Sequence, residues 1–394
     1  MKKEQSSIYW IFILCLSVCA VFCAIWTFTG TWPWVHQPYN SYILQAQAWK
    51  SGSLSLPENY HHLELAIFNG KYFVSFPPFP SYVMFPFVCL GFNGCDGLIA
   101  FVSALLGAVY AFLVAEHFGV KKERALLFSL LLTIGSNWLF TSQIAWVWFI
   151  AQNMAFTLSL MAIYYALKNR PALSLALWAC AVGCRPFQIF CLPVILYFIY
   201  KAAKENGQTL RSKWKCVIPM AVIALSYMIL NYARFKNPLE FGHNYLPEFT
   251  EAENGQFSLV YILDNIKCLF RLPKVSFSGA WEYQAFNGTN IFIVSPIFIS
   301  YIAYAVYAIV KNKADRKLLA IAAVSIVLQL LVICAHKTMG GSQFGNRYTN
   351  DVLPLVFLSL ASSLGTENDY DKFNIPLLAF GLIVNAVGSV LYYM

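Results

Sequence analysis

Long apolar stretches recur along this 394-residue chain and limit what it can fold into. Most are close to the length of about 20 residues with which an α-helix crosses a hydrocarbon layer. Only 11% of the residues are charged and 59% are hydrophobic, so water cannot cover most of the chain. The stretches lack the polar alternation of a membrane barrel, which predicts helices. We therefore predict an all-α polytopic membrane protein with about eleven transmembrane helices, near residues 8–29, 96–118, 125–141, 145–167, 171–184, 187–200, 216–234, 291–310, 318–336, 351–365 and 374–393.

The basic residues predict the orientation of these helices. Of the 27 Lys and Arg residues, 17 fall in short connectors that share one side of the membrane with the N-terminus. Because cytoplasmic connectors carry the excess of positive charge, we expect the N-terminus inside and the C-terminus outside. The net charge of +9 is then mostly a topology signal. Its dispersal over many connectors is unlike a nucleic-acid-binding surface, so no nucleic-acid partner is expected.

Two long segments, 30–95 and 235–290, remain on the outer face. In the first, apolar residues of Ser41–Lys50 recur at helical spacing, which predicts an amphipathic helix lying on the membrane. Prolines interrupt the approach to the next span, and we predict a second short surface or re-entrant helix at Phe79–Leu90. The segment 235–290 has too few regularly spaced apolar residues for its own core, which predicts a lid or wall. The whole chain, 1–394, is thus predicted to form a single transmembrane domain with an outer cap.

The first outer segment contains a candidate base, Glu64, which follows two histidines. A carboxylate in a partly dehydrated cavity can accept a proton from an attacking hydroxyl, and His62 could tune it or contact a phosphate. The alternative is that Glu64 is an ordinary solvated acid of a loop. Lys71 lies in an Asn-Gly-Lys-Tyr stretch that predicts a tight turn, and we include it among the substrate-binding candidates.

Arg185 stands at the outer end of an apolar helix, in the stretch Gly-Cys-Arg-Pro-Phe-Gln. An unpaired guanidinium is unfavourable there unless it reaches the interface or meets an anion. Its fork of donors suits a phosphate better than a lysine does. We favour phosphate binding by Arg185 over the alternative of a helix-end arginine that only reaches toward water.

A short outer loop with the sequence M-G-G-S-Q-F-G-N-R-Y-T-N-D-V-L-P contains Arg347, Tyr348 and Asp351. Its glycines let the backbone come close to a ligand, and its polar side chains supply donors and acceptors at a membrane boundary. The alternative is a capped helix start at Asn350 or Asp351, and both interpretations are compatible. Lys337, together with His336, could add positive charge to the same outer site.

Other acids are also expected outside, and their spacing does not choose among them: Asp96, Glu240, Glu248, Glu251, Glu253, Asp264 and Glu282. The chain contains no Walker A sequence, no dinucleotide-binding glycine motif on a strand and helix, no H-E-x-x-H and no G-x-S-x-G. Transport driven by ATP through this chain alone is therefore not expected.

Four features together carry a family resemblance. They are a Y-x-x-x-A-x-x-x-x-x-G arrangement of Tyr42, Ala46 and Gly52, the run F-N-G-K-Y-F-V-S-F-P-P-F-P, the Arg185-Pro186 pair after a span, and the Q-F-G-N-R-Y-T-N-D-V-L-P loop. With the topology, they resemble the integral-membrane glycosyltransferases of the GT-C fold class. The similarity is to the bacterial group related to protein mannosyltransferases and to the lipid A aminoarabinose and Rgt-type sugar transferases.

The resemblance implies a GT-C-like helical bundle and an enzyme of the bacterial plasma membrane. Similar proteins take a sugar from a polyprenyl-phosphate carrier and pass it to a glycan, lipid or protein acceptor on the outer face. They usually invert the sugar, and this group commonly needs no metal, so that the lipid-linked donor is a substrate and no cofactor is required. An acid of the first outer loop acts as base and basic residues hold the departing phosphate, which implies Glu64 for the first role and Arg185 and Arg347 for the second.

One departure from the family pattern leaves the base open. The family's acid normally precedes the Y-x-x-x-A helix, where this chain has His-Gln-Pro-Tyr-Asn-Ser at 36–41. Glu64 or another outer acid takes over, His36 serves, or the chain has an altered function. A competing hypothesis is a non-enzymatic membrane protein, either a lipid-linked sugar flippase or transporter or a partner in envelope-polymer assembly. Transporters more often have paired repeats and broken helices at mid-membrane, whereas the polar residues here gather at the outer boundary, which favours the enzyme.

Overall fold

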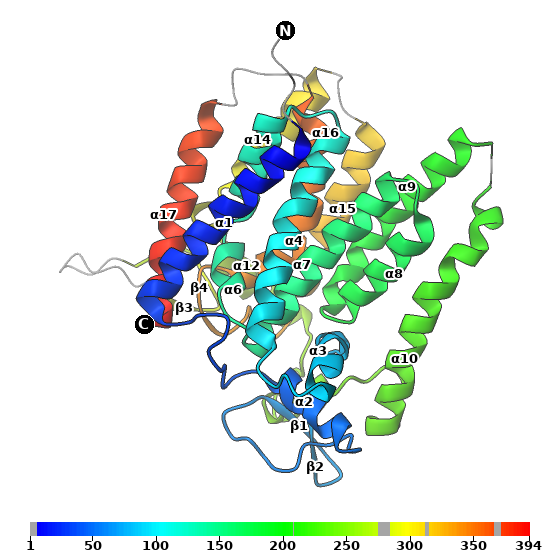
Figure 1. Ribbon diagram of the computed structural model, residues 1–394, viewed down its shortest axis with the longest axis vertical. Coiled ribbons are helices and arrows are strands. Elements are labelled where there is room, and N and C mark those ends of the chain that lie inside the picture. Colours follow the sequence, from blue (N-terminus) through cyan, green and yellow to red (C-terminus); the bar gives the residue numbers. More distant parts are fainter. Residues whose placement is uncertain (1–5, 208, 275–283, 312–314, 366–371) are drawn as a thin grey trace.

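Helices packed side by side form a bundle, and smaller elements cover one of its ends (Figure 1). The computed structural model describes residues 6–207, 209–274, 284–311, 315–365 and 372–394. The bundle comprises α1 (Ser7–Thr29), α4 (Asp96–His117), α5 (Lys122–Leu132), α6 (Trp138–Ser142), α7 (Val147–Leu167), α8 (Pro171–Val182), α9 (Leu192–Glu205), α10 (Ile218–Phe235), α14 (Ile297–Val310), α15 (Arg316–Cys334), α16 (Leu353–Leu364) and α17 (Asn374–Tyr393). Short 3₁₀ helices precede three of them: η1 (Pro186–Cys191), η2 (Leu210–Val217) and η5 (Arg347–Val352).

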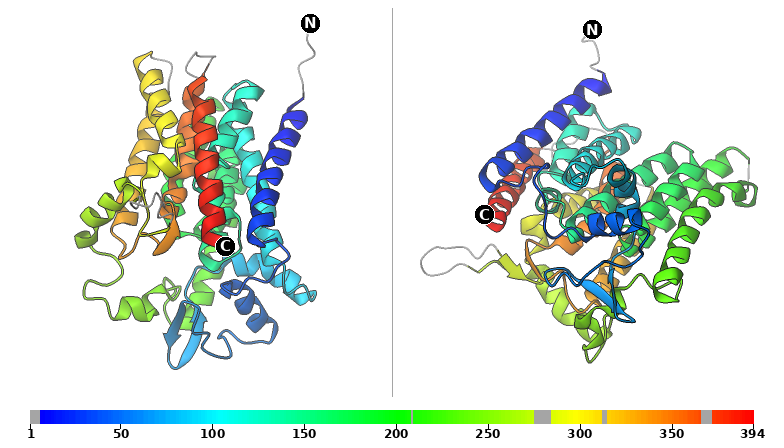
Figure 2. Two further views of the ribbon diagram at one scale, coloured as in Figure 1. Left: turned by 90° about the vertical axis from the view of Figure 1, so that its left-hand side faces the viewer. Right: turned by 60° about the horizontal axis from the view of Figure 1, so that its bottom comes forward.

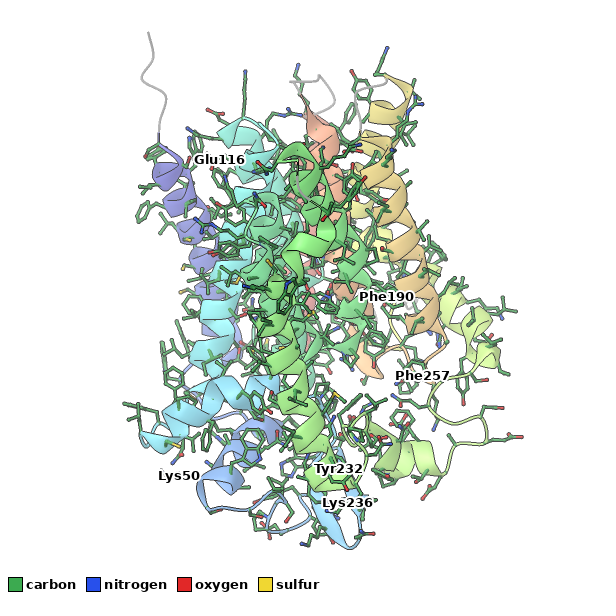
Figure 3. The ribbon with its side chains drawn as sticks, turned by 90° about the vertical axis from the view of Figure 1, so that its right-hand side faces the viewer. Lys50, Glu116, Phe190, Tyr232, Lys236 and Phe257 are labelled. Carbon is green, nitrogen blue, oxygen red and sulfur yellow. The ribbon has the colours of Figure 1, made fainter. Side chains whose placement is uncertain are left out.

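The prediction of a helical polytopic membrane protein is confirmed. Seven helical segments of the described residues are long and apolar enough to cross a membrane: Ser7–Thr29, Asp96–His117, Val147–Leu167, Pro186–Glu205, Trp214–Phe235, Arg316–Cys334 and Asn374–Tyr393. The other four predicted ranges contain shorter helices. Charged side chains lie toward the two ends of the bundle, with Glu116 near one end and Lys50 and Lys236 near the other (Figure 3). This distribution leaves an apolar belt between them.

The predicted span 125–141 is wrong as a continuous helix, because the chain breaks between α5 and α6. The hydroxyl of Thr133 donates to the Ser129 carbonyl at 2.7 Å, and Ser136 bonds back in the same way to Leu132. Such bonds compete with the helical backbone. The break also lets the backbone of Gly135 touch α17, since a Cβ on Gly381 would stand 2.1 Å from the Gly135 carbonyl oxygen. Asn137 is thereby placed at the covered end of the bundle.

The first outer segment folds into α2 (Ser41–Lys50), the hairpin of β1 (Leu65–Phe68) and β2 (Lys71–Val74), and α3 (Phe79–Cys89). Both predicted helices are present, and α2 begins where the Asn40 side chain accepts from the Tyr42 N–H at 3.1 Å. The apolar face of α2 is, however, covered by protein. Its apolar residues Tyr42, Ile43 and Ala46 are buried in a protein cluster. They pack there because α3 covers this face, and Ser81 of α3 donates to the Tyr42 carbonyl at 3.0 Å.

The second outer segment contains η3 (His243–Tyr245), α11 (Pro247–Thr250), η4 (Leu259–Tyr261), α12 (Ile262–Phe270) and β3 (Gln284–Phe286), and α13 (Ile291–Val294) follows it. Main-chain hydrogen bonds join it to the end of α15: the Ser258 N–H donates to Ala335 at 2.8 Å and the Lys337 N–H to Gln256 at 2.9 Å. Strand β3 pairs antiparallel with β4 (Ser342–Phe344), just before Arg347. Glu282 lies outside the described residues. Our assignment of the whole chain to one domain stays a prediction.

The outer elements and the basic connectors lie at opposite ends of the bundle. Helix α1 begins at the end where α4, α14 and α16 finish, whereas α2 and the β1–β2 hairpin lie at the other end (Figures 1 and 2). A site built from the two outer segments is therefore held at one end of the helices.

Candidate functional site

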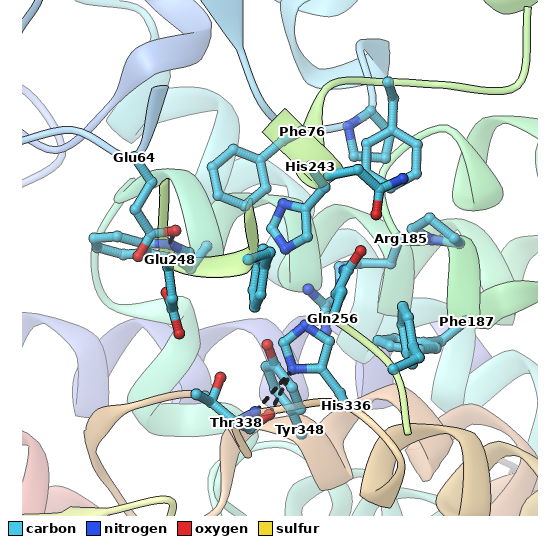
Figure 4. Close-up of a pocket in the computed structure, with 18 of the residues that line it drawn as sticks. Glu64, Phe76, Arg185, Phe187, His243, Glu248, Gln256, His336, Thr338 and Tyr348 are labelled. Atoms are coloured by element: carbon cyan, nitrogen blue, oxygen red, sulfur yellow. Dashed lines mark hydrogen bonds between the residues drawn. The ribbon is translucent and has the colours of Figure 1, made fainter. Parts of the chain in front are cut away.

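A cavity of about 470 Å³ lies between the end of the bundle and the two outer segments. Its walls come from the loop before β1, the β2–α3 loop, the junction of α8 and η1, residues 239–257, and the loop that follows α15. Figure 4 shows Glu64, Arg185, His243, His336 and Tyr348 around it. This volume is in the range of small-molecule sites.

The loop that carries Arg347 is fixed by the α5–α6 break. The Asn137 side chain accepts from the Asn346 N–H at 3.0 Å and donates to the Phe344 carbonyl at 3.4 Å. Gly345 has φ +74°, and a Cβ there would stand 2.1 Å from the Asn137 amide nitrogen. Only glycine fits so close to another chain segment in this conformation. Gly345 therefore determines the backbone position from which the Arg347 side chain extends.

The Arg347 side chain is only 6% exposed, yet it has no carboxylate partner among the described residues. Its Nε and Nη2 both donate to the Gly340 carbonyl, at 3.1 and 3.0 Å. Its Nη1 has no hydrogen-bond partner in the described part of the chain. A buried donor without a partner is unfavourable by about 1–3 kcal/mol. Arg347 therefore brings an unused donor and a positive charge to the cavity wall.

Arg185 lines the same cavity, but its charge is already paired. Its Nη2 lies 2.7 Å from Asp351 Oδ2 and its Nε 3.4 Å from Asp351 Oδ1. Burial disfavours the cation, but the charge and hydrogen bond of Asp351 together with Tyr348 and Tyr42 outweigh this effect and raise the pKa of Arg185. The predicted substrate contact of Asp351 is not supported by its position, because its side chain is 1% exposed and faces Arg185. Asp351 fixes the orientation of Arg185.

Tyr348 separates the two arginines. The Arg185 guanidinium carbon lies 5.0 Å from the centre of the Tyr348 ring and that of Arg347 lies 4.8 Å from it. Each cation thus gains an aromatic contact, which compensates part of the loss of water. The ring keeps two guanidinium groups in one cavity wall without direct contact between them.

Glu64 also lines the cavity, and its Oε2 accepts from the Trp148 indole N–H at 2.8 Å. The Glu64 side chain is exposed to solvent, yet the surrounding cavity wall displaces part of its water. This desolvation raises the pKa of Glu64; the Trp148 bond and the Arg347 charge act in the opposite direction, and Glu248 adds to the rise. A carboxylate of raised pKa is a better proton acceptor than an ordinary one.

The structure does not bring four other predicted residues to the cavity wall. His36, His62 and Lys71 are exposed outside it, and the His62 Nε2 contacts the Pro38 carbonyl at 3.1 Å. Lys337 lies behind the wall, where its Nζ donates to the Glu248 carbonyl at 2.8 Å. The sequence places these residues near the site along the chain, but the hairpin and the loop turn them away.

Several cavity residues were not selected from the sequence. His243, Glu240 and Glu248 come from the second outer segment, whose lack of periodicity gave no means of choosing among its polar residues. Glu240 is tied within its own loop, accepting from the Gly242 N–H at 2.5 Å. Trp148, at the start of α7, looks like an interface aromatic in sequence. For His243, Glu240 and Glu248 the only signal in the sequence is their place in the second outer segment, and Trp148 has no such signal.

A smaller hollow of about 260 Å³ adjoins the cavity. Glu64 and Glu248 line both spaces, and the hollow is completed by Asn59, His61, Leu63, Leu65, Ile67, Leu246 and Pro247. It has no Lys or Arg in its described lining. Arginines therefore line only the larger space, whereas Glu64 and Glu248 line both. In the described ranges, no three His, Cys, Asp or Glu residues are grouped to hold a metal ion.

No family model matches this chain, and no curated protein matches its sequence. Among solved structures, ArnT of Cupriavidus metallidurans bound to undecaprenyl phosphate is similar with a TM-score of 0.58 and 11% identity, over 98% of this chain and 77% of that one. The apo oligosaccharyltransferase of Archaeoglobus fulgidus is similar with a TM-score of 0.54 and 13% identity, over 98% of this chain and 56% of that one. At such identities the likeness concerns the fold. The chain therefore has the GT-C fold that these membrane proteins share, as the resemblance of its motifs predicted.

Proposed function

We propose that this protein is an integral-membrane glycosyltransferase that moves a sugar from a polyprenyl-phosphate-linked donor to an acceptor. The observation that carries the proposal is the buried Arg347, whose free Nη1 shares one cavity with the Glu64 carboxylate. An anion holder and a proton acceptor are the two groups that such a transfer requires. The shared fold supports it, since ArnT was solved with undecaprenyl phosphate bound.

In the proposed reaction, the acceptor oxygen attacks the anomeric carbon of the sugar and its proton passes to Glu64. The bond between that carbon and the phosphate oxygen breaks, and the oxygen keeps the electron pair. Arg347 holds this oxygen or its neighbours, because preorganised donors stabilise charge where it develops. Arg185 contributes through Tyr348, which it fixes in place from the other side.

The acceptor is proposed to enter through the smaller hollow. A base must lie between the acceptor hydroxyl and the donor sugar, and Glu64 lines both spaces. Because the hollow presents the carboxylates of Glu64 and Glu248 and no Lys or Arg in its described lining, it disfavours an acceptor that carries phosphate or carboxylate beside its hydroxyl. We therefore propose an uncharged hydroxyl acceptor, such as a sugar or a side-chain hydroxyl.

We further propose that the cavity faces the outside of a bacterial plasma membrane. The connectors rich in Lys and Arg lie at the end of the bundle opposite to the cavity. With those connectors in the cytoplasm, the N-terminus is inside and the C-terminus outside. The single membrane domain with an outer cap at 235–290 belongs to the same proposal.

The experiment uses the purified protein in lipid nanodiscs, with undecaprenyl phosphate as binding probe and a panel of undecaprenyl-phosphate sugars as donors. We expect micromolar or tighter probe binding, and release of undecaprenyl phosphate from at least one donor when a neutral glycoside is present. Arg347→Met should abolish binding, whereas Glu64→Gln should retain binding and lose transfer at least a hundredfold, as removal of a general base does. Lys71→Met, on the exposed hairpin, is the matched control and should change neither.

Two results would overturn the proposal. The first is wild-type protein that does not bind undecaprenyl phosphate, and the second is Arg347→Met that binds it as well as wild type. Binding without transfer of any sugar, combined with movement of the lipid-linked sugar across the bilayer, would favour the flippase alternative.

A further inference from the structure

Two imidazoles face each other in the cationic part of the cavity. His243 belongs to η3 of the second outer segment, and His336 follows α15. Both line the cavity, and their ring centres are 6.1 Å apart (Figure 4). His336 also lies 5.9 Å from the Tyr348 ring that separates the two arginines. A phosphate held by Arg347 would therefore share the cavity with both imidazoles.

Backbone carbonyls hold one nitrogen of each ring. The His243 Nδ1 lies 3.1 Å from the Ser75 carbonyl and the His336 Nδ1 lies 2.7 Å from the Thr338 carbonyl. The Thr338 N–H also donates to the same His336 Nδ1, at 3.2 Å. Because a carbonyl only accepts, the His243 Nδ1 carries a proton and its neutral ring keeps the lone pair on Nε2, whereas the His336 Nδ1 lies within reach of both a donor and an acceptor. Neither Nε2 has a hydrogen-bond partner among the residues that the structure describes.

The charged groups near the two rings are mostly cationic. Burial, followed by the charges of Arg185, Arg347 and Lys337, lowers the pKa of His336 to about 4. Burial, followed by His336 and Arg185, lowers the pKa of His243 to about 3. The other side chains that contact the two rings are aromatic: Phe76, Phe241, Phe249, Phe257 and Tyr348. The acids of the cavity have other partners or positions. Glu240 is hydrogen-bonded within its own loop, and Glu64 and Glu248 line the boundary with the smaller hollow. The rings are thus neutral while no anion is present.

A count of charges shows that the cavity offers one positive charge fewer than the leaving phosphate requires. The phosphodiester of a lipid-linked sugar carries one negative charge, and the phosphomonoester that departs approaches two. Arg185 is neutralised by Asp351, so Arg347 alone among the described cavity-lining arginines offers an unpaired positive charge. One charge matches the donor, but the leaving phosphate needs a second.

We propose that His243 and His336 are phosphate ligands that become imidazolium as the anion arrives, so that binding of the leaving phosphate is coupled to uptake of a proton from solvent. This rests on the proposed function and extends it. The protonated Nε2 donates to a phosphate oxygen, while the acceptor's own proton is on Glu64. When the lipid phosphate leaves, the imidazole returns its proton to water and the cavity is restored.

The test measures undecaprenyl phosphate binding by titration calorimetry at pH 7.5, in two buffers that differ in ionisation enthalpy. At this pH the probe is already mostly dianionic, so its own ionisation contributes little. Wild type should take up about one proton, and its affinity should fall about tenfold per pH unit from pH 7 to 8.5. The double variant His243→Asn, His336→Asn keeps an amide that can bond the backbone carbonyls but cannot titrate. It should bind more weakly, with no proton uptake and no pH dependence.

His117→Asn, on the last turn of α4 at the other end of the bundle, is the control and should behave as wild type. The single variants are measured beside the double one, and thermal unfolding of the empty proteins verifies that each is folded. If wild type binds without proton uptake, or the double variant retains the pH dependence, the histidine proposal is overturned and the proposed function stands. If wild type does not bind the probe at all, the proposed function itself is overturned.

Discussion

Replacing each cavity arginine by methionine should change stability to very different extents, although both side chains line the same cavity. Methionine has a similar length and no charge. Arg185→Met leaves Asp351 buried, 1% exposed and without its cation. Arg347→Met removes a cation that has no carboxylate partner among the described residues and whose Nη1 is unsatisfied. Because both arginines line the same cavity, the two variants compare the effect of the paired and the unpaired charge at one site.

The magnitudes follow from these contacts. Removing one member of a buried ion pair costs about 3–5 kcal/mol, because the remaining charge stays buried. For Arg347, the loss of two hydrogen bonds to one carbonyl, about 1 kcal/mol each, is offset by removing a desolvated charge and an unpaired donor. We therefore expect Arg185→Met to lose about 3–5 kcal/mol of unfolding free energy and Arg347→Met to change it by about 1 kcal/mol or less.

The assay is reversible unfolding of the empty protein by SDS, followed by circular dichroism, with undecaprenyl phosphate binding measured on the same samples. The double variant Arg185→Met, Asp351→Leu should recover most of the loss, since no charge is then left unpaired. The reasoning is refuted if Arg347→Met destabilises as strongly as Arg185→Met, or if the double variant is no more stable than the single one.

Three further predictions concern pH, the loop and the hollow. Because the pKa values of His243 and His336 lie near 3 and 4, below the ordinary 6.5, the unfolded chain binds more protons than the folded one in this range. Stability of the empty protein should thus fall as the pH drops from 6.5 to 4, and a melting curve that is flat with pH would contradict this. Gly345→Ala should cost about 2–4 kcal/mol through strain and overlap, whereas Gly341→Ala, at φ +66° with open space, should cost only about 1–2 kcal/mol in the same unfolding assay. Ile67→Trp, on the wall of the smaller hollow, should raise the acceptor KM at least tenfold with unchanged binding of undecaprenyl phosphate, and equal KM values would reject the acceptor site.

The helices could be predicted from the sequence because each apolar run must satisfy its own backbone inside a membrane. Ser41–Lys50 even has the predicted bounds, since Asn40 caps its start. The break between α5 and α6 was missed because its residues are apolar enough to pass for a continuous span. Its cause is the contact of Gly135 with Gly381, which are far apart in sequence. The covering of α2 by α3 was missed for the same reason.

For the candidate site, too, the sequence predicts some residues and not the contacts between distant parts of the chain. Glu64, Arg185 and Arg347 could be singled out because charged residues are rare in this chain, and the structure places all three around one cavity. The partner of Arg185 could not be predicted, because Asp351 lies in another loop and the sequence suggested a ligand contact for it. His36 and Lys71 were also candidates in the sequence, but the structure places His36 in the exposed connection before α2 and Lys71 at the exposed start of β2. Their catalytic and binding roles remain predictions.

The two histidine-bearing segments belong to separate pieces of the chain that meet only at this end of the molecule. A handful of main-chain bonds and the β3–β4 ladder fasten the outer piece to the helices. A phosphate bound between the two rings would add a further link between the second outer segment and the helices. The segment would then be held more firmly when the phosphate is bound than when it has left. Binding of phosphate in the cavity should therefore lower the rate at which an added protease cuts the stretch from His243 to Phe270.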